Sequence, residues 1–173
     1  MSDAADKAPL GNYEHLKGLE PLIGTWAGEW DIPQDRPTAN IKKGNYTLTV
    51  TWKWEVFQSA LSLHYAVGQP GSDPIWRLIM LIGWDTASKR IICTAFEATG
   101  GHARVDDWEI QGDKVTFKGK GSLPAGNKTA WTMIYSDINK DSCTTQMTDV
   151  LVDGQASPSQ PGWKVMLKRV EAR

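Results

Sequence analysis

The chain has 173 residues, which fits one domain of ordinary size. Its 19 Lys and Arg side chains nearly balance its 20 Asp and Glu side chains, and the net charge of −1 argues against binding to nucleic acid or to a membrane surface through bulk charge. Apolar residues make up 40% and charged residues 23%, a composition typical of a globular protein and not of a disordered chain. The unusual feature is nine tryptophans against three phenylalanines.

The start of the chain is polar and carries no hydrophobic periodicity. We therefore expect residues 1–13 to be a flexible leader to a single domain over residues 14–173. The leader lacks the apolar core of a secretory signal, and no stretch approaches the roughly 20 apolar residues that span a bilayer. Cys93 and Cys143 have no CxxC partner, so a reduced, buried pair is favoured over a disulfide. Together these features predict a cytoplasmic protein.

One short helix is expected, over residues 14–21. Leu16, Leu19 and Leu22 recur at a spacing of three and form a narrow apolar stripe, and Pro21 discourages continuation of the helix.

The rest of the chain alternates between apolar and polar residues with the period of a β-strand. Ten runs qualify as strands: 22–30, 46–56, 60–67, 76–84, 90–98, 102–110, 114–119, 128–136, 142–152 and 163–170. The connections are mostly of hairpin length, with no helical crossover of the kind that parallel strands need. Because closure removes two long sheet edges, we predict an all-β fold: an antiparallel up-and-down closed barrel of about ten strands, capped at one end by the short helix.

Register follows from a four-residue loop over residues 57–60. It pairs Val56 with Leu61, Trp54 with Leu63, Trp52 with Tyr65 and Val50 with Val67. The same register places His64 opposite Lys53 on the polar face.

The hairpin over residues 76–98 is apolar on both sides. Ile79 and Leu81 oppose the main apolar face of its first strand, and its second strand is equally two-sided. Such a hairpin needs cover on both sides, from the short helix or from a second subunit. We expect a homodimer through this hairpin.

The tryptophans suggest a hollow interior. Eight of them fall in predicted strands and Trp163 opens the last one, and a ten-stranded barrel is wider than side chains easily fill. They either plug the core or line a pocket for a flat, apolar molecule. The residues expected to line the apolar wall are Trp52, Trp54, Leu63, Tyr65, Met80, Phe96, Trp131 and Met133.

Two sets of motifs resemble a known family. The run from Leu19 to Trp30, with its Gly-Thr-Trp-x-Gly core, is similar to the opening of lipocalin-like (calycin) barrels and to that of nitrobindin-type ten-stranded barrels. The turn Gly83-Trp84-Asp85 and the strand ending Phe96–Gly100 resemble those of a largely uncharacterised bacterial lipocalin-like family. The resemblance implies a barrel with a helix over one end.

The same resemblance raises the question of haem. Nitrobindin-type proteins hold ferric haem through a histidine near the C-terminus, whereas this chain has no histidine after His102 and offers Lys164 and Lys168 in the matching region. We therefore expect no haem and no other cofactor.

Titratable residues give few signals of chemistry. His15, His64 and His102 lack metal-ligand spacing, so no metal site is expected, and neither a nucleophile elbow nor a nucleotide-binding motif appears.

Arg104 and Asp106 share a strand face with Trp108 in the predicted alternation. They form either a solvated ion pair or a site that binds a polar group of a ligand. Glu97, Gln146 and Thr148 are further strand positions that reach inward in some registers.

Two functions of different class fit this sequence. The leading hypothesis is an intracellular binding protein for a small hydrophobic or aromatic molecule, with Arg104 and Trp108 as ligand-binding residues beside those of the apolar wall. The alternative is a cofactor-independent isomerase, cyclase or hydrolase that uses His64, Asp106 or Tyr65 in the cavity. A haem or NO sensor is a third hypothesis.

Overall fold

A computed structural model describes residues 11–156 and 162–170. The predicted leader, residues 1–13, falls largely outside these residues, and the first described helix begins at Tyr13. In this part of the chain no helix is both long and apolar enough to cross a membrane.

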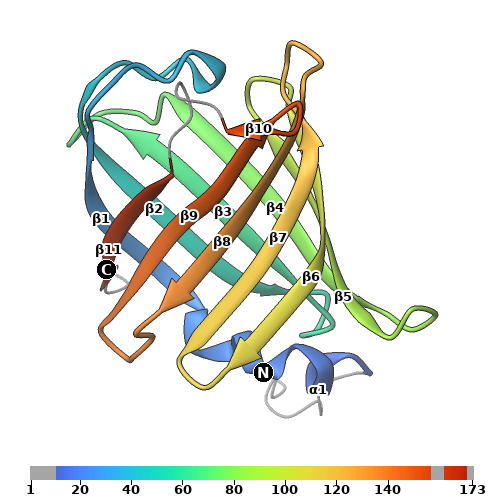
Figure 1. The fold of residues 1–173 in the computed structure, drawn as a ribbon. Coiled ribbons are helices and arrows are strands. Elements are labelled where there is room, and N and C mark those ends of the chain that lie inside the picture. Colours follow the sequence, from blue (N-terminus) through green and yellow to red (C-terminus); the bar gives the residue numbers. More distant parts are fainter. Residues whose placement is uncertain (1–10, 157–161, 171–173) are drawn as a thin grey trace.

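Ten antiparallel strands form a closed barrel (Figure 1). Each strand pairs with its neighbours in sequence, and pairing of β9 with both β8 and β11, and of β11 with β1, closes the ring. The bounds are β1 (Gly24–Ile32), β2 (Gly44–Glu55), β3 (Ala60–Gly68), β4 (Trp76–Asp85), β5 (Arg90–Glu97), β6 (His102–Gln111), β7 (Lys114–Ser122), β8 (Lys128–Ser136), β9 (Ser142–Val152) and β11 (Trp163–Val170). A two-residue strand, β10 (Gln155–Ala156), extends β9 outside the ring. The predicted fold class is confirmed.

The N-terminal helix closes one end of the barrel (Figure 1). It consists of α1 (Tyr13–Leu16) followed by a 3-10 helix, η1 (Lys17–Leu22). The spacing of three between Leu16, Leu19 and Leu22 suits a helix with three residues per turn, and all three side chains are fully buried. The predicted apolar stripe is therefore confirmed.

The turn between β2 and β3 shifts the predicted pairing by two residues. Positive φ angles at Val56, Phe57 and Gln58 put the loop at residues 56–59, so Trp54 pairs with Leu61 and Trp52 with Leu63. A shift of two keeps every side chain on its predicted face. Only Val56 leaves the barrel wall and becomes 70% exposed in the turn.

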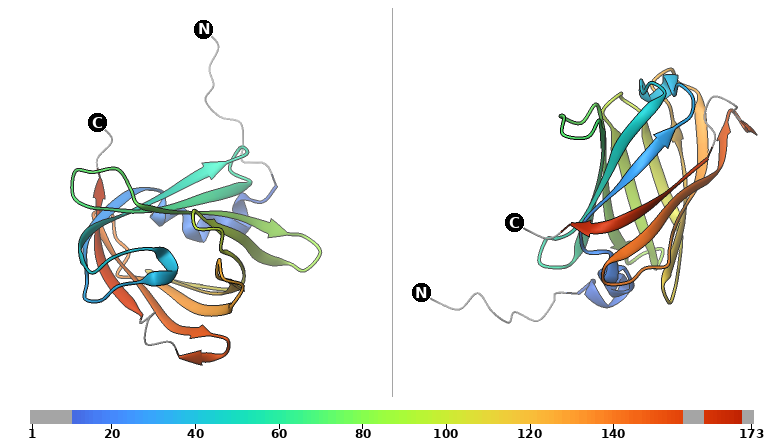
Figure 2. Two further views of the ribbon diagram at one scale, coloured as in Figure 1. Left: turned by 90° about the horizontal axis from the view of Figure 1, so that it is seen from above. Right: turned by 90° about the vertical axis from the view of Figure 1, so that its left-hand side faces the viewer.

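The hairpin of β4 and β5 projects from the barrel wall (Figures 1 and 2). β5 pairs with β6 only from Cys93 to Phe96, although both strands continue beyond that segment. Leu81 and Phe96 are more than half exposed on its outer surface. The N-terminal helix covers the other side, where the His15 ring stacks on Trp84 with centroids 3.9 Å apart.

The half of the barrel nearest the helix is filled with side chains. Trp26 and Trp52 are buried, and the indole Nε1 of Trp26 donates a hydrogen bond to the carbonyl of Leu22 at 2.7 Å. Trp52 packs edge-on against Tyr135, and Phe117 lies between Tyr135 and Trp108. Any space for a guest must therefore lie toward the opposite end.

A candidate ligand cavity at the open end

The end of the barrel opposite the helix contains a cavity of about 160 Å³. Its walls come from the ends of the strands and from the connection between β1 and β2, which includes the 3-10 helix η2 (Pro37–Ala39). Seen from above, this connection crosses over the barrel (Figure 2). The interior is thus packed near α1 and hollow at the other end.

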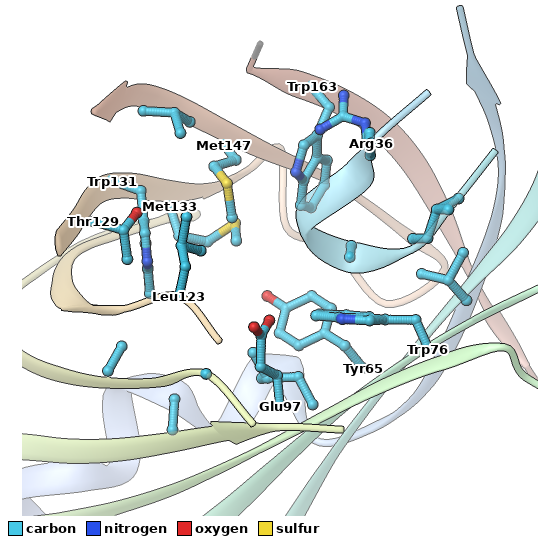
Figure 3. A pocket seen from close by; sticks show the side chains of 18 of the residues that line it. Arg36, Tyr65, Trp76, Glu97, Leu123, Thr129, Trp131, Met133, Met147 and Trp163 are labelled. Carbon is cyan, nitrogen blue, oxygen red and sulfur yellow. The ribbon is translucent and has the colours of Figure 1, made fainter. Parts of the chain in front are cut away.

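Four tryptophans supply most of the aromatic wall: Trp30, Trp76, Trp131 and Trp163. Trp30 and Trp163 contact each other, with centroids 5.0 Å apart. The indole of Trp131 lies so close to Gly119 that a Cβ atom there would sit 2.3 Å from its ring. Gly119 on β7 therefore makes room for the indole of Trp131, which forms part of the cavity wall (Figure 3).

The connection between β1 and β2 brings a charged residue to the cavity. Arg36 and Ile41 pair through two backbone hydrogen bonds, which fold the intervening residues into η2. The guanidinium of Arg36 lies 5.0 Å from the centroid of the Trp30 ring, and the residue is only 8% exposed. Burial lowers the pKa of Arg36, although its ordinary value is so high that the group stays charged near neutral pH.

Two buried phenols meet at the inner edge of the cavity. The hydroxyl of Tyr65, which lines the cavity, shares a hydrogen bond with that of Tyr135. Burial raises the pKa of both phenols, so both remain protonated near neutral pH. Tyr65 is therefore a neutral hydrogen-bonding group and not a base.

A polar strip follows the turn between β5 and β6. Glu97 ends β5 on the same face as Cys93 and Ala95, because alternate residues of a strand share a face. The hydroxyl of Thr99 donates to the Glu97 carboxylate at 2.9 Å. At the rim, His102 Nδ1 and the Ser122 hydroxyl are 3.0 Å apart. Of the three inward-reaching polar candidates, Glu97 lines this cavity, whereas Gln146 and Thr148 do not.

Four residues of the predicted apolar wall line the cavity: Tyr65, Met80, Trp131 and Met133. Three others belong to the packed half. Trp52 and Leu63 are buried below the cavity, and Trp54 packs against Tyr13 with centroids 5.5 Å apart. Alternation placed these residues inward correctly, but it did not say at which end of the strands the barrel is hollow.

The prediction that Phe96 lines the apolar wall of the interior is wrong. It is 53% exposed, because the face shared by Cys93 and Ala95 is the one that turns inward. Arg104 is likewise exposed on the outer surface. Neither residue lines the cavity.

A β-bulge explains the positions of Asp106 and Trp108. The register of β6 against β7 shifts between Val105 and Asp107, which leaves Asp106 exposed and turns Trp108 inward. Trp108 stacks on Phe117 with centroids 4.4 Å apart, within the packed half. The prediction that Trp108 shares a face with Arg104 and Asp106 is therefore wrong, while Arg104 and Asp106 are both exposed on the outer surface.

The acid/base residues of the enzyme hypothesis do not meet. His64 is exposed on the outer surface between the inward-facing Leu63 and Tyr65, and Asp106 is also exposed. Among these candidates only Tyr65 reaches the cavity. Within the described residues, no three His, Cys, Asp or Glu side chains gather as metal ligands.

The sequence analysis did not single out Trp30, Trp76, Trp163 or Arg36 as cavity residues. Trp30 lies near the end of β1 and Trp76 begins β4, and both positions are at the end of the barrel away from α1. Following the chain from the helix through successive antiparallel strands assigns Trp30 and Trp76 to this end of the barrel from the sequence alone. Nothing in the sequence indicated Arg36, because its position depends on how an irregular connection folds.

Comparison with known proteins yields a match of fold. No protein-family model and no curated protein sequence matches this chain. Among solved structures it is similar to Rv2717c from M. tuberculosis, with 19% sequence identity and a TM-score of 0.65 over 96% of this chain and 100% of that one. At this identity the likeness supports the closed barrel architecture and nothing finer.

The residues of β11 do not fit a haem ligated from the last strand. Lys164 and Lys168, which the resemblance to nitrobindin-type barrels matched to the region of their haem-ligating histidine, are both exposed on the outer surface. The inward residue at the start of this strand is Trp163, whose indole forms part of the cavity wall.

Proposed function

We propose that this protein binds a small hydrophobic or aromatic molecule in the cavity at the open end of the barrel. The observation that carries this proposal is a hollow of about 160 Å³ walled by four indoles inside an otherwise packed barrel. An apolar cavity of about 150 Å³ holds one benzene ring, so the buried part of the guest is about one ring in size.

The balance of groups around the cavity favours binding over catalysis. Apolar and aromatic side chains dominate the wall, and the few polar groups are spread around it, as in sites that orient a ligand. The protein is proposed to work in the cytoplasm. The burial of two free thiols, at Cys93 and Cys143, supports a reducing compartment.

The proposal is tested by a titration with naphthalene in which binding is monitored by tryptophan fluorescence. The matched variants are Ala95→Leu, which fills the cavity from β5, and Thr94→Leu, which adds a similar side chain on the outer face of the same strand. Ala95→Leu is expected to weaken binding by about tenfold, whereas Thr94→Leu leaves it unchanged. Absence of binding to the unmodified protein, or equal affinities in both variants, would contradict the proposal.

The outer surface of the β4–β5 hairpin supports a second proposal, that two copies associate there. Leu81 is 55% exposed and Phe96 is 53% exposed. β5 also lacks pairing with β6 before Cys93. Light scattering is expected to give the mass of a dimer, and the double variant Leu81→Lys with Phe96→Lys that of a monomer. A monomer in the unmodified protein would exclude this interface.

A further inference from the structure

Glu97 is the only carboxylate among the described residues that line the cavity. It stands at the inner face of β5, beyond Ala95, and its neighbour across the sheet, Leu78 of β4, also lines the cavity. Figure 3 shows the carboxylate directed into the space that Tyr65 and Trp131 also face. A carboxylate in an apolar cavity is costly unless a partner of opposite charge or a hydrogen-bond donor meets it.

The local backbone is shaped around this carboxylate. A Cβ atom at Gly101 would lie 2.2 Å from Oε1 of Glu97, so only glycine lets the carboxylate rest where it does. The backbone N–H of Glu97 also donates to the carbonyl of Gly101 at 3.0 Å, which ties the two residues across the turn. The turn thus holds the backbone of Glu97 in place and leaves room at Gly101 for its carboxylate.

The carboxylate of Glu97 can accept further hydrogen bonds from a ligand. In the described part of the chain, the hydroxyl of Thr99 is the one side-chain donor to Glu97, and no Lys, Arg or His forms an ion pair with it. An ionised carboxylate can accept about four hydrogen bonds. A cationic group in the cavity would therefore find a partner already in place.

The aromatic walls favour the same charge. The faces of indole and phenol rings carry negative potential and attract ammonium groups, and cages of such rings recognise quaternary ammonium ligands. Trp131, Trp163, Trp76 and Tyr65 surround the space into which Glu97 points (Figure 3). Arg36 is the permanent cation of the lining, and it lies across the cavity from Glu97, over the Trp30 ring. The cavity therefore has an anionic side and a cationic side.

We infer that the guest is a small organic cation, a protonated amine or quaternary ammonium on an aromatic or apolar body, with its charged group against Glu97. This inference rests on the proposed function and specifies the chemical class of its ligand.

Two probes of the same shape test the charge directly. Benzyltrimethylammonium carries a quaternary nitrogen where neopentylbenzene carries a carbon, so their difference in affinity reports the charge alone. The unmodified protein is expected to bind the cation at least about tenfold more tightly, as measured by tryptophan fluorescence or calorimetry. This comparison needs no variant and does not depend on the folding of one.

Variants then assign the effect to Glu97. Glu97→Gln keeps an oxygen that accepts from Thr99 and removes the charge, and it is expected to weaken binding of the cation by about tenfold while leaving neopentylbenzene unchanged. Glu109→Gln, on the exposed outer face of β6, is the control and changes neither affinity.

The outcomes separate the two proposals. Binding of neopentylbenzene with no preference for the cation, or a preference that persists in Glu97→Gln, overturns the inference and leaves the proposed function standing. Failure of both probes to bind the unmodified protein overturns both.

Discussion

The two ends of this barrel use the same residue type in opposite ways. At the end closed by α1 and η1, Trp26 and Trp52 are fully buried and fill the interior. At the open end, Trp131 and Trp163 are only partly buried and form the wall of a cavity. A tryptophan inside a barrel is thus core or ligand wall according to what covers it, and the helix makes that difference here.

The largest effect is expected from truncating a tryptophan at the closed end. Trp26→Ala should lower the free energy of unfolding by about 3–5 kcal/mol, because it leaves a void among buried side chains. Trp163→Ala should cost no more than about 1–2 kcal/mol, because its indole already faces a cavity. Urea unfolding of both variants measures the difference, and equal losses would mean that the two ends are packed alike.

Arg169 holds the closed end together, and its removal should have the next largest effect. Its guanidinium donates to the carbonyls of Pro21, Ile23 and Lys140 and lies 4.0 Å from the Trp26 ring centroid. Arg169→Met should lower the free energy of unfolding by about 2 kcal/mol. The exposed Arg104 on β6 provides the control, and Arg104→Met should change stability by less than about 0.5 kcal/mol. A similar loss in both variants would remove the special role of Arg169.

The stability of the protein at alkaline pH should test whether water is excluded from the Cys93 thiol. Burial raises the pKa of the Cys93 thiol from 9.0 to about 12. Above pH 9 the unfolded chain loses this proton while the folded chain keeps it, so the stabilisation is complete below pH 9 and is lost as pH rises toward 12.

The expected slope is on the order of 1 kcal/mol per pH unit between pH 9 and 12. Urea unfolding at pH 8 and pH 10 should show a smaller loss in Cys93→Ala than in the unmodified protein. Parallel losses in the two proteins would mean that water reaches this thiol.

The smallest effect concerns the wall of the cavity. Gly119→Ala places a methyl group against the Trp131 indole, which must then move into the cavity. Affinity for naphthalene should fall by about threefold, with little change in stability. Gly83→Ala is the matched control, because a Cβ atom there meets nothing within 4 Å. Unchanged affinity in Gly119→Ala would place the guest away from Trp131.

Alternation along the strands predicted which residues face inward, with one type of exception. Cys93 and Ala95 on β5 share the inner face as a pair, but an apolar residue on each side of this strand left the choice between the faces open, and Phe96 was assigned to the wrong one. On β6 a single bulge at Asp106 reversed the pattern for Trp108. Bulges and two-sided strands depend on the partner strand, which a local pattern does not contain.

The sequence by itself determined the ten strands, their antiparallel order, the apolar stripe of the cap and the inward side of most strands. These follow from local rules: residue periodicity, turn chemistry and hairpin length. Only the tertiary structure decided that one end is packed and the other hollow, that Arg36 and Glu97 face the same cavity, and that His64, Phe96 and Asp106 lie outside it. These features depend on contacts between residues distant in sequence, which are set only when the barrel closes.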